Sequence, residues 1–138
     1  MTETMVRQMR PTHPGEILRE IRIAKPAGKF GHSYQKVRHP ASGFAVVGVA
    51  VSLQLGADGS CESTSVGVTG VASKAYRAAA VEAALKGQQL SDQTIAAAAA
   101  HATDGVDANS DLYASADYRR HLAQVYTRRA LQAALAKA

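Results

Sequence analysis

The sequence predicts an α+β fold, an antiparallel β-sheet of three to four strands followed by a three-helix bundle packed on one face of the sheet. Hydrophobic residues alternate with a period of two in the first half of the chain, and their spacing becomes helical after Val71. Glycine and proline separate the alternating segments at the short intervals of hairpins. Strands that precede helices along the chain are typical of the α+β class.

The strands are predicted from this alternation and from the turns between them. The clearest is Ala45 to Leu55, in which every odd residue from Val47 onward is apolar. Cys61 to Val71 is rich in threonine, serine and valine, follows a Gly-Ala-Asp-Gly turn, and is expected to pair with the preceding strand as a hairpin. Two earlier strands are expected, at residues 17–23, with three isoleucines on one side, and at residues 30–37, before a loop at residues 39–43.

Two helices are predicted in the region that follows, each beginning at a serine whose hydroxyl can accept a hydrogen bond from the first turn. Ser73 is expected to begin a helix that runs through Lys86 and ends at Gly87 in a left-handed cap. Ser91 is expected to begin a second helix, which continues through an alanine tract to about Thr103.

The third helix is expected to begin after Ser115, which can cap it in the same way. On a helical projection Arg129 falls in the middle of an apolar stripe, so we expect its side chain to be buried and hydrogen-bonded to a carboxylate or to backbone carbonyls. Arg119 and Arg120 are interpreted as residues of a subunit interface. The stripe consists of Tyr118, Leu122, Val125, Tyr126 and Ala133.

Composition and charge exclude several classes of function. The formal net charge is +5, but the basic residues are scattered and do not interleave with aromatic residues, which argues against nucleic-acid binding. The single cysteine, Cys61, allows no internal disulfide and fits a reducing compartment. No apolar run approaches the length of a membrane span. We therefore expect a cytoplasmic protein that binds neither nucleic acid nor membrane.

The sequence shows no pattern typical of a metal or catalytic site. Its histidines lack the i, i+4 spacing that places two ligands on one helical face, and no carboxylate pattern joins them. Cys61, Ser63 and Ser65 could be nucleophiles by residue type, but their positions at a strand start and within alternating polarity already explain them. No metal ligand and no catalytic residue is therefore assigned.

Two motifs resemble a known family. The first is YQKVRHPASGFAVVGVAV, Tyr34 to Val51, and the second is YRRHLAQVYTRRAL, Tyr118 to Leu131, with an alanine-rich helical stretch between them. Together they resemble the C-terminal domain of the FAD-binding medium subunit of molybdenum hydroxylases, in particular the aerobic carbon monoxide dehydrogenase flavoprotein and, more distantly, xanthine dehydrogenase. The resemblance implies one such domain over residues 14–138, and residues 1–13 are expected to be a flexible N-terminal tail.

The resemblance implies that three residues face the flavin. Tyr34 and Lys36 match the tyrosine-any-lysine pattern of the bacterial members, and Phe44 matches the position just after their common glycine-aspartate pair. This chain has Ser42-Gly43 in place of that pair, so the acidic residue is missing. An alternative is that Tyr34 and Phe44 pack at the sheet edge and that Lys36 is a solvated lysine whose stem lies along the sheet.

The function implied by the resemblance is that of a non-catalytic module, which helps cover the flavin and brace subunit assembly in an oxidoreductase complex. Its partners would be the FAD-binding domain and the molybdenum and iron–sulfur subunits. FAD is expected only in a complete flavin subunit, because this chain has no glycine-rich loop to hold the pyrophosphate. The isolated domain is expected to dock or to self-associate as a homo-oligomer. An alternative is a standalone interaction or small-ligand-binding module that has lost the flavin context.

Overall fold

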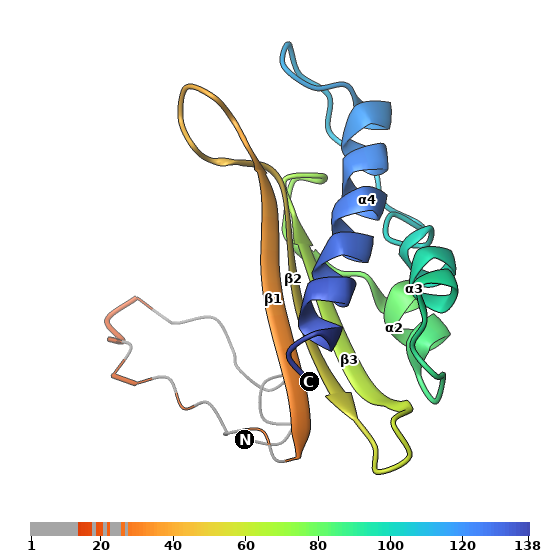
Figure 1. Cartoon of the computed structure of the whole chain (residues 1–138). Helices are drawn as coiled ribbons and strands as arrows, with labels where there is room; N and C mark the ends of the chain where they lie inside the picture. Colours follow the sequence, from red (N-terminus) through yellow and green to blue (C-terminus); the bar gives the residue numbers. More distant parts are fainter. Residues whose placement is uncertain (1–13, 18, 21, 23–25, 27) are drawn as a thin grey trace.

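A computed structural model describes residues 14–17, 19, 20, 22, 26 and 28–138 of the chain. They form a four-stranded antiparallel sheet with strand order β1-β2-β3-β4, and the helices lie on one side of it (Figure 1). The predicted α+β class, with strands before helices, is confirmed. The elements are β1 (Lys29–Arg38), β2 (Ala45–Leu55), β3 (Cys61–Thr69), β4 (Tyr76–Arg77), α2 (Ala79–Leu85), α3 (Asp92–Ala99) and α4 (Ala116–Leu135).

The first three strands form the meander that the alternation predicts. β1 pairs with β2 along its whole length, and β2 pairs with β3. The odd residues of β2 from Val47 to Leu53 are buried under the helices, and Ala45 and Leu55 at the strand ends are half-buried. The turn to β3 is closed by the Gly56 N–H, which donates to the Ser60 carbonyl at 2.9 Å. The pattern predicts this region well because a slip of one residue would turn the whole apolar set of β2 toward solvent.

The strand predicted at residues 17–23 is not found at the described positions. Ile17 is 92% exposed, and the other described residues of this segment belong to no strand. Ile21 and Ile23, on which the prediction also depended, lie outside the described residues, as does the expected tail at residues 1–13. Alternation alone does not make a strand, because a strand is stabilised by a neighbour that pairs with it.

The first predicted helix begins later than expected. Ser73 caps no helix, because the chain there turns back and forms β4 against β3, and α2 begins only after it. Glu82 of α2 stabilises this arrangement: its carboxylate accepts hydrogen bonds from the Val66 N–H at 2.9 Å and from Arg77 at 2.7 Å. A side chain of α2 thus completes the edge of β3, a tertiary contact that local sequence does not reveal. The predicted left-handed end at Gly87 is confirmed, with φ of 75°.

The predicted caps of the other two helices are confirmed. The Ser91 hydroxyl accepts from the Thr94 N–H at 3.2 Å, and the Thr94 hydroxyl accepts from the Ser91 N–H at 2.8 Å, which makes a capping box. Ser115 caps α4 through its hydroxyl. α3 ends at Ala99 and not near Thr103, because the next N–H groups bond three residues back and the α-helix gives way to turns.

α4 packs against β1 and β2 through small side chains, and the prediction for Arg129 is wrong. Arg129 is exposed and lies over the ring of Tyr126, 5.0 Å from its centroid. The buried arginine is Arg119, which is only 7% exposed. The helix turns its alanines toward the sheet because small residues allow close packing, so several larger members of the predicted stripe lie at its margin. The buried residues of α4 are Arg119, Leu122, Ala123, Thr127, Ala130, Leu131 and Ala134.

Tyr76 makes the stability of the fold sensitive to high pH. Its hydroxyl donates to the Ala102 carbonyl at 3.0 Å, and burial raises the pKa of Tyr76 from 10.0 to about 12. The folded state therefore holds this proton more tightly, so its stabilising contribution is complete below pH 10 and is lost as the pH rises through about 12. We expect urea unfolding to show a steeper loss of stability across this window than in Tyr76→Phe. The exposed Tyr118→Phe serves as the control, and equal slopes in all three proteins would contradict the prediction.

Candidate functional site

The face of the sheet opposite the helices is the candidate site, and it is called the open face here. None of the described helices covers it (Figure 1). The centre of this face is made of small residues. Ala50 of β2 pairs with Gly67 of β3 along one edge and with Tyr34 of β1 along the other. A shallow groove between β2 and β3 follows this small-residue centre. The open face consists of Phe30, His32, Tyr34 and Lys36, then Gly48, Ala50, Ser52 and Gln54, and finally Ser63, Ser65, Gly67 and Thr69.

The three residues assigned to the flavin lie at one end of this face. Tyr34 is 56% exposed, and Phe44, in the loop between β1 and β2, is 78% exposed. Lys36 is half-buried, and its Nζ donates to the Gly43 carbonyl at 3.2 Å. Lys36 therefore ties β1 to the residue that precedes Phe44. This hydrogen bond is exposed, so the Lys36 ammonium also remains in contact with water.

The loop that carries Phe44 is ordered by its own hydrogen bonds. The His39 N–H donates to the Phe44 carbonyl, and the Gly43 N–H donates to the His39 carbonyl, both at 2.8 Å. The Ser42 hydroxyl accepts a hydrogen bond from the Phe44 N–H at 3.3 Å. The ring of His39 also contacts the ring of Tyr113, with centroids 4.3 Å apart. The phenylalanine is thus exposed at the base of a structured loop, directly before β2.

Arg119, interpreted from the sequence as a subunit-interface residue, is instead buried inside the domain near this loop. Its guanidinium donates to the carbonyls of Val46 and Gly70, each at 2.8 Å, and forms an ion pair with Asp111. It therefore joins the start of β2, just after Phe44, to the end of β3 and to the loop before α4. The Ala114 backbone N–H, and after it Arg119, hold the pKa of Asp111 below its usual value. Arg119 lies at helical spacing from the buried alanines of α4, and this pattern could have predicted that its side chain is buried.

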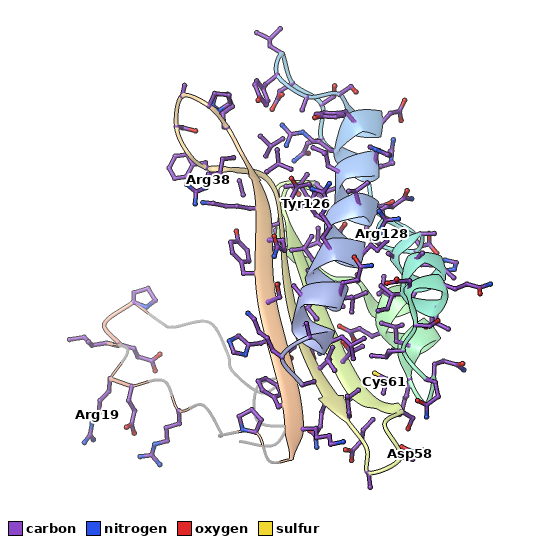
Figure 2. All side chains as sticks on the ribbon, viewed as in Figure 1. Arg19, Arg38, Asp58, Cys61, Tyr126 and Arg128 are labelled. Atoms are coloured by element: carbon purple, nitrogen blue, oxygen red, sulfur yellow. The ribbon has the colours of Figure 1, made fainter. Side chains whose placement is uncertain are left out.

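Within the part of the chain that the structure describes, no cluster of three or more His, Cys, Asp or Glu residues could hold a metal ion. Cys61 is buried beside α2 (Figure 2), and burial raises the pKa of its thiol. No helix among the described residues is long and apolar enough to cross a membrane.

Comparison with known proteins places this arrangement in a family. The model of the CO dehydrogenase flavoprotein C-terminal domain matches residues 32–134, which extend from within β1 into α4 and include the open face apart from Phe30. The chain belongs to this family. The resemblance that the two sequence motifs carry is thereby confirmed.

The curated relatives are medium or alpha subunits of dehydrogenase complexes. The medium chain of carbon monoxide dehydrogenase from Afipia carboxidovorans is 34% identical over 125 residues, which are 91% of this chain and 43% of the relative. The alpha subunit of the 6-hydroxypseudooxynicotine dehydrogenase complex from Paenarthrobacter nicotinovorans is 30% identical and is covered to 42%. This chain thus spans less than half the length of the relatives it matches.

Solved structures agree with the fold. The Cu,Mo-CO dehydrogenase in its cyanide-inactivated form is similar with a TM-score of 0.74 and 31% identity, over 82% of this chain and 39% of that chain. Quinoline 2-oxidoreductase from Pseudomonas putida 86 is similar with a TM-score of 0.71 and 27% identity, over 80% of this chain and 38% of that chain. The sheet with helices on one side is therefore a shared fold of this family.

Proposed function

We propose that this domain is the C-terminal module of an FAD-binding subunit in a molybdenum hydroxylase, where it covers the flavin with the end of the open face that carries Tyr34, Lys36 and Phe44. The observation that carries the proposal is the exposure of two aromatic side chains beside a positioned ammonium on this face. Relatives of the same fold are subunits of carbon monoxide dehydrogenase and of a nicotine-derivative dehydrogenase. The module itself supplies no catalytic residue.

The residues of this end suit the ring of FAD and not its phosphates. Exposed aromatic rings can stack on a planar ring system, and the Lys36 ammonium can stabilise negative charge on it. FAD, when bound, would accept and pass on electrons in the complex. The described residues carry no glycine-rich phosphate loop, and the N-terminus of α4, which lies at this end of the molecule, is on the helix side of the sheet (Figure 1), so we assign the pyrophosphate to another part of the subunit. The chain can thus cover a flavin but not retain one.

The bracing of subunits is assigned to exposed apolar residues at the same end of the molecule. Leu112, Tyr113 and Tyr118 are exposed on the loop before α4 and on its first turns, and the His39–Tyr113 contact joins this loop to the loop of Phe44. Exposed apolar groups that gather in one region favour contact with a partner. We assign these groups to contacts with the FAD-binding domain or with the molybdenum and iron–sulfur subunits in a cytoplasmic complex.

Purification distinguishes a module of a flavin complex from an independent protein. The chain produced alone is expected to be colourless and to retain no stoichiometric FAD, because it lacks a pyrophosphate site. The tagged chain purified from its native host is expected to carry flavin absorbance and molybdenum in near-equal molar amounts, together with a molar excess of iron, because each iron–sulfur cluster holds at least two iron atoms. Flavin bound to the chain produced alone would contradict the proposal.

A variant of the exposed loop links the complex to the candidate site. Phe44→Glu is expected to lower the recovered flavin about tenfold, because a charge would be placed in an apolar contact. Arg128→Glu, on the exposed side of α4 (Figure 2), is the matched control and should recover the wild-type amount. Recovery of the chain in a complex without flavin or metals would support the alternative, a standalone interaction module. Sedimentation of the isolated chain at several concentrations would then show whether its partner is a second copy.

A further inference from the structure

We propose that Gly48 is a positioning residue, which lets the ring of Tyr34 lie down across the open face and present its outer surface as a stacking platform for a planar aromatic ring. The inference rests on the proposed function, in which that planar ring is the isoalloxazine of FAD. It assigns a role to Gly48, which lies within the first sequence motif but to which the sequence analysis gave no role.

The position of the Tyr34 hydroxyl shows how the ring lies. The Cα of Tyr34 pairs with Ala50, whereas Gly48 pairs with Lys36, so Tyr34 and Gly48 are diagonal neighbours. A Cβ atom on Gly48 would lie 2.6 Å from the Tyr34 Oη and 3.3 Å from its Cζ. Side chains of a strand usually stand roughly perpendicular to the sheet, which would hold the hydroxyl far above the next strand. The Tyr34 ring must therefore lean over the sheet with its hydroxyl end resting on Gly48.

The surroundings keep the outer surface of this ring free. Tyr34 remains 56% exposed although its hydroxyl end is in contact with the sheet. Gly67 of β3, which pairs with Ala50, has no heavy atom within 4 Å of the place where its Cβ would be, so no side chain rises over the centre of the open face at that position. Lys36 lies two residues along β1 on the same face, held by the Gly43 carbonyl. A flat ring next to an ammonium suits a planar aromatic ligand with electron-rich carbonyl groups.

A glycine at position 48 is expected to destabilise β2, so its presence there requires a structural explanation. A glycine inside a strand weakens it, because the unfolded chain has more freedom and no side chain packs. At Gly67, which has open space around it, alanine should be tolerated or even stabilising. At Gly48, the methyl group would meet the Tyr34 hydroxyl and the Thr69 Cγ2, which lies 3.0 Å away. Alanine there must lift the ring off the sheet.

The stability of four variants of the whole chain tests the geometry. Gly48→Ala is expected to have a lower Tm than the matched Gly67→Ala, because the Tyr34 ring must swing off the sheet to make room for the methyl group, whereas Gly67→Ala should leave Tm unchanged or higher. Tyr34→Phe removes the atom that a Cβ would meet at 2.6 Å, so Gly48→Ala in the Tyr34→Phe background should cost clearly less. Equal Tm values for the two glycine variants, or an unchanged cost in the Tyr34→Phe background, would overturn the inference.

An NMR chemical shift reports the position of the Tyr34 ring, and a general loss of stability would not produce the same change. In the wild-type NMR spectrum, the Hα proton of Gly48 on the open face is expected to be displaced from its usual position by the ring current of Tyr34, and the Hα protons of Gly67 are not. The shift should disappear in Tyr34→Ser, which removes the ring. Gly48 Hα protons at their usual position in the wild type would overturn the inference directly.

FMN added at millimolar concentration is the ligand probe. It is expected to shift the resonances of Tyr34 and Lys36 in the wild type and in Gly67→Ala, and to shift them at least several-fold less in Gly48→Ala. If FMN shifts nothing on the open face while the Tm and Hα results hold, the positioning of Tyr34 stands and its assignment to flavin falls. If FMN shifts these resonances equally in both glycine variants, the proposed function stands and the role of Gly48 falls.

Discussion

Replacing Arg119 with alanine is expected to lower the free energy of unfolding by about 3 kcal/mol. The side chain is 7% exposed, and its loss leaves the carbonyls of Val46 and Gly70 without their donor inside the fold. Most of the cost comes from these two acceptors, because the Asp111 side chain is 54% exposed and can return to water. Urea unfolding followed by circular dichroism measures the effect.

Two further arginine variants make this prediction specific. Arg120→Ala is the matched control: Arg120 neighbours Arg119 on α4, but its ion pair with Asp117 is exposed, so the loss should stay within about 0.5 kcal/mol. Arg119→Lys keeps the charge, but the lysine ammonium cannot reproduce the planar guanidinium that bonds two carbonyls and a carboxylate at once. Its stability should therefore fall between that of the wild type and that of Arg119→Ala. An Arg119→Ala protein as stable as Arg120→Ala would mean that Arg119 does not join these segments.

Gly31→Ala is expected to destabilise the protein by about 3 kcal/mol through overpacking. A Cβ atom at this position would overlap the Ala134 carbonyl, so α4 would have to move away from β1. The neighbouring Lys137, whose Nζ donates to the His32 carbonyl at 3.1 Å, would lose its partner in the same movement. The expected result is a lower urea midpoint with an unchanged denaturant dependence, because the same surface is still exposed on unfolding.

Gly67→Ala is the matched control for Gly31→Ala. Both glycines lie within strands of the same sheet, but Gly67 is on the open face and has room for a methyl group. Its substitution should be neutral or stabilising, because alanine restricts the unfolded chain. A stability of Gly31→Ala equal to that of Gly67→Ala would show that α4 can shift from β1 at no cost, contrary to the close packing of the helix on the sheet.

The candidate site was predicted in part. The residues Tyr34, Lys36 and Phe44 were chosen because their spacing resembles a family pattern, and the structure places Tyr34 and Lys36 on one face, with Lys36 bonded beside Phe44. The lean of the Tyr34 ring was not predictable, because it depends on Gly48 of the next strand. The buried arginine of α4 was misplaced for a related reason. A helical projection weighted by large apolar residues selects Arg129, but the sheet selects the alanine side of the helix and with it Arg119.

The sequence by itself determined the meander of β1, β2 and β3, the serine caps of α3 and α4, and the family of the chain. Each of these follows from residues that lie close together along the chain, where alternation, turn residues and capping hydroxyls act locally. Only the tertiary structure decided that Glu82 completes the edge of β3, that Gly31 admits α4, and that Arg119 joins the loop of Phe44 to the loop before α4. These features depend on close packing and on buried hydrogen-bond acceptors contributed by distant segments, which become neighbours only when the chain has folded.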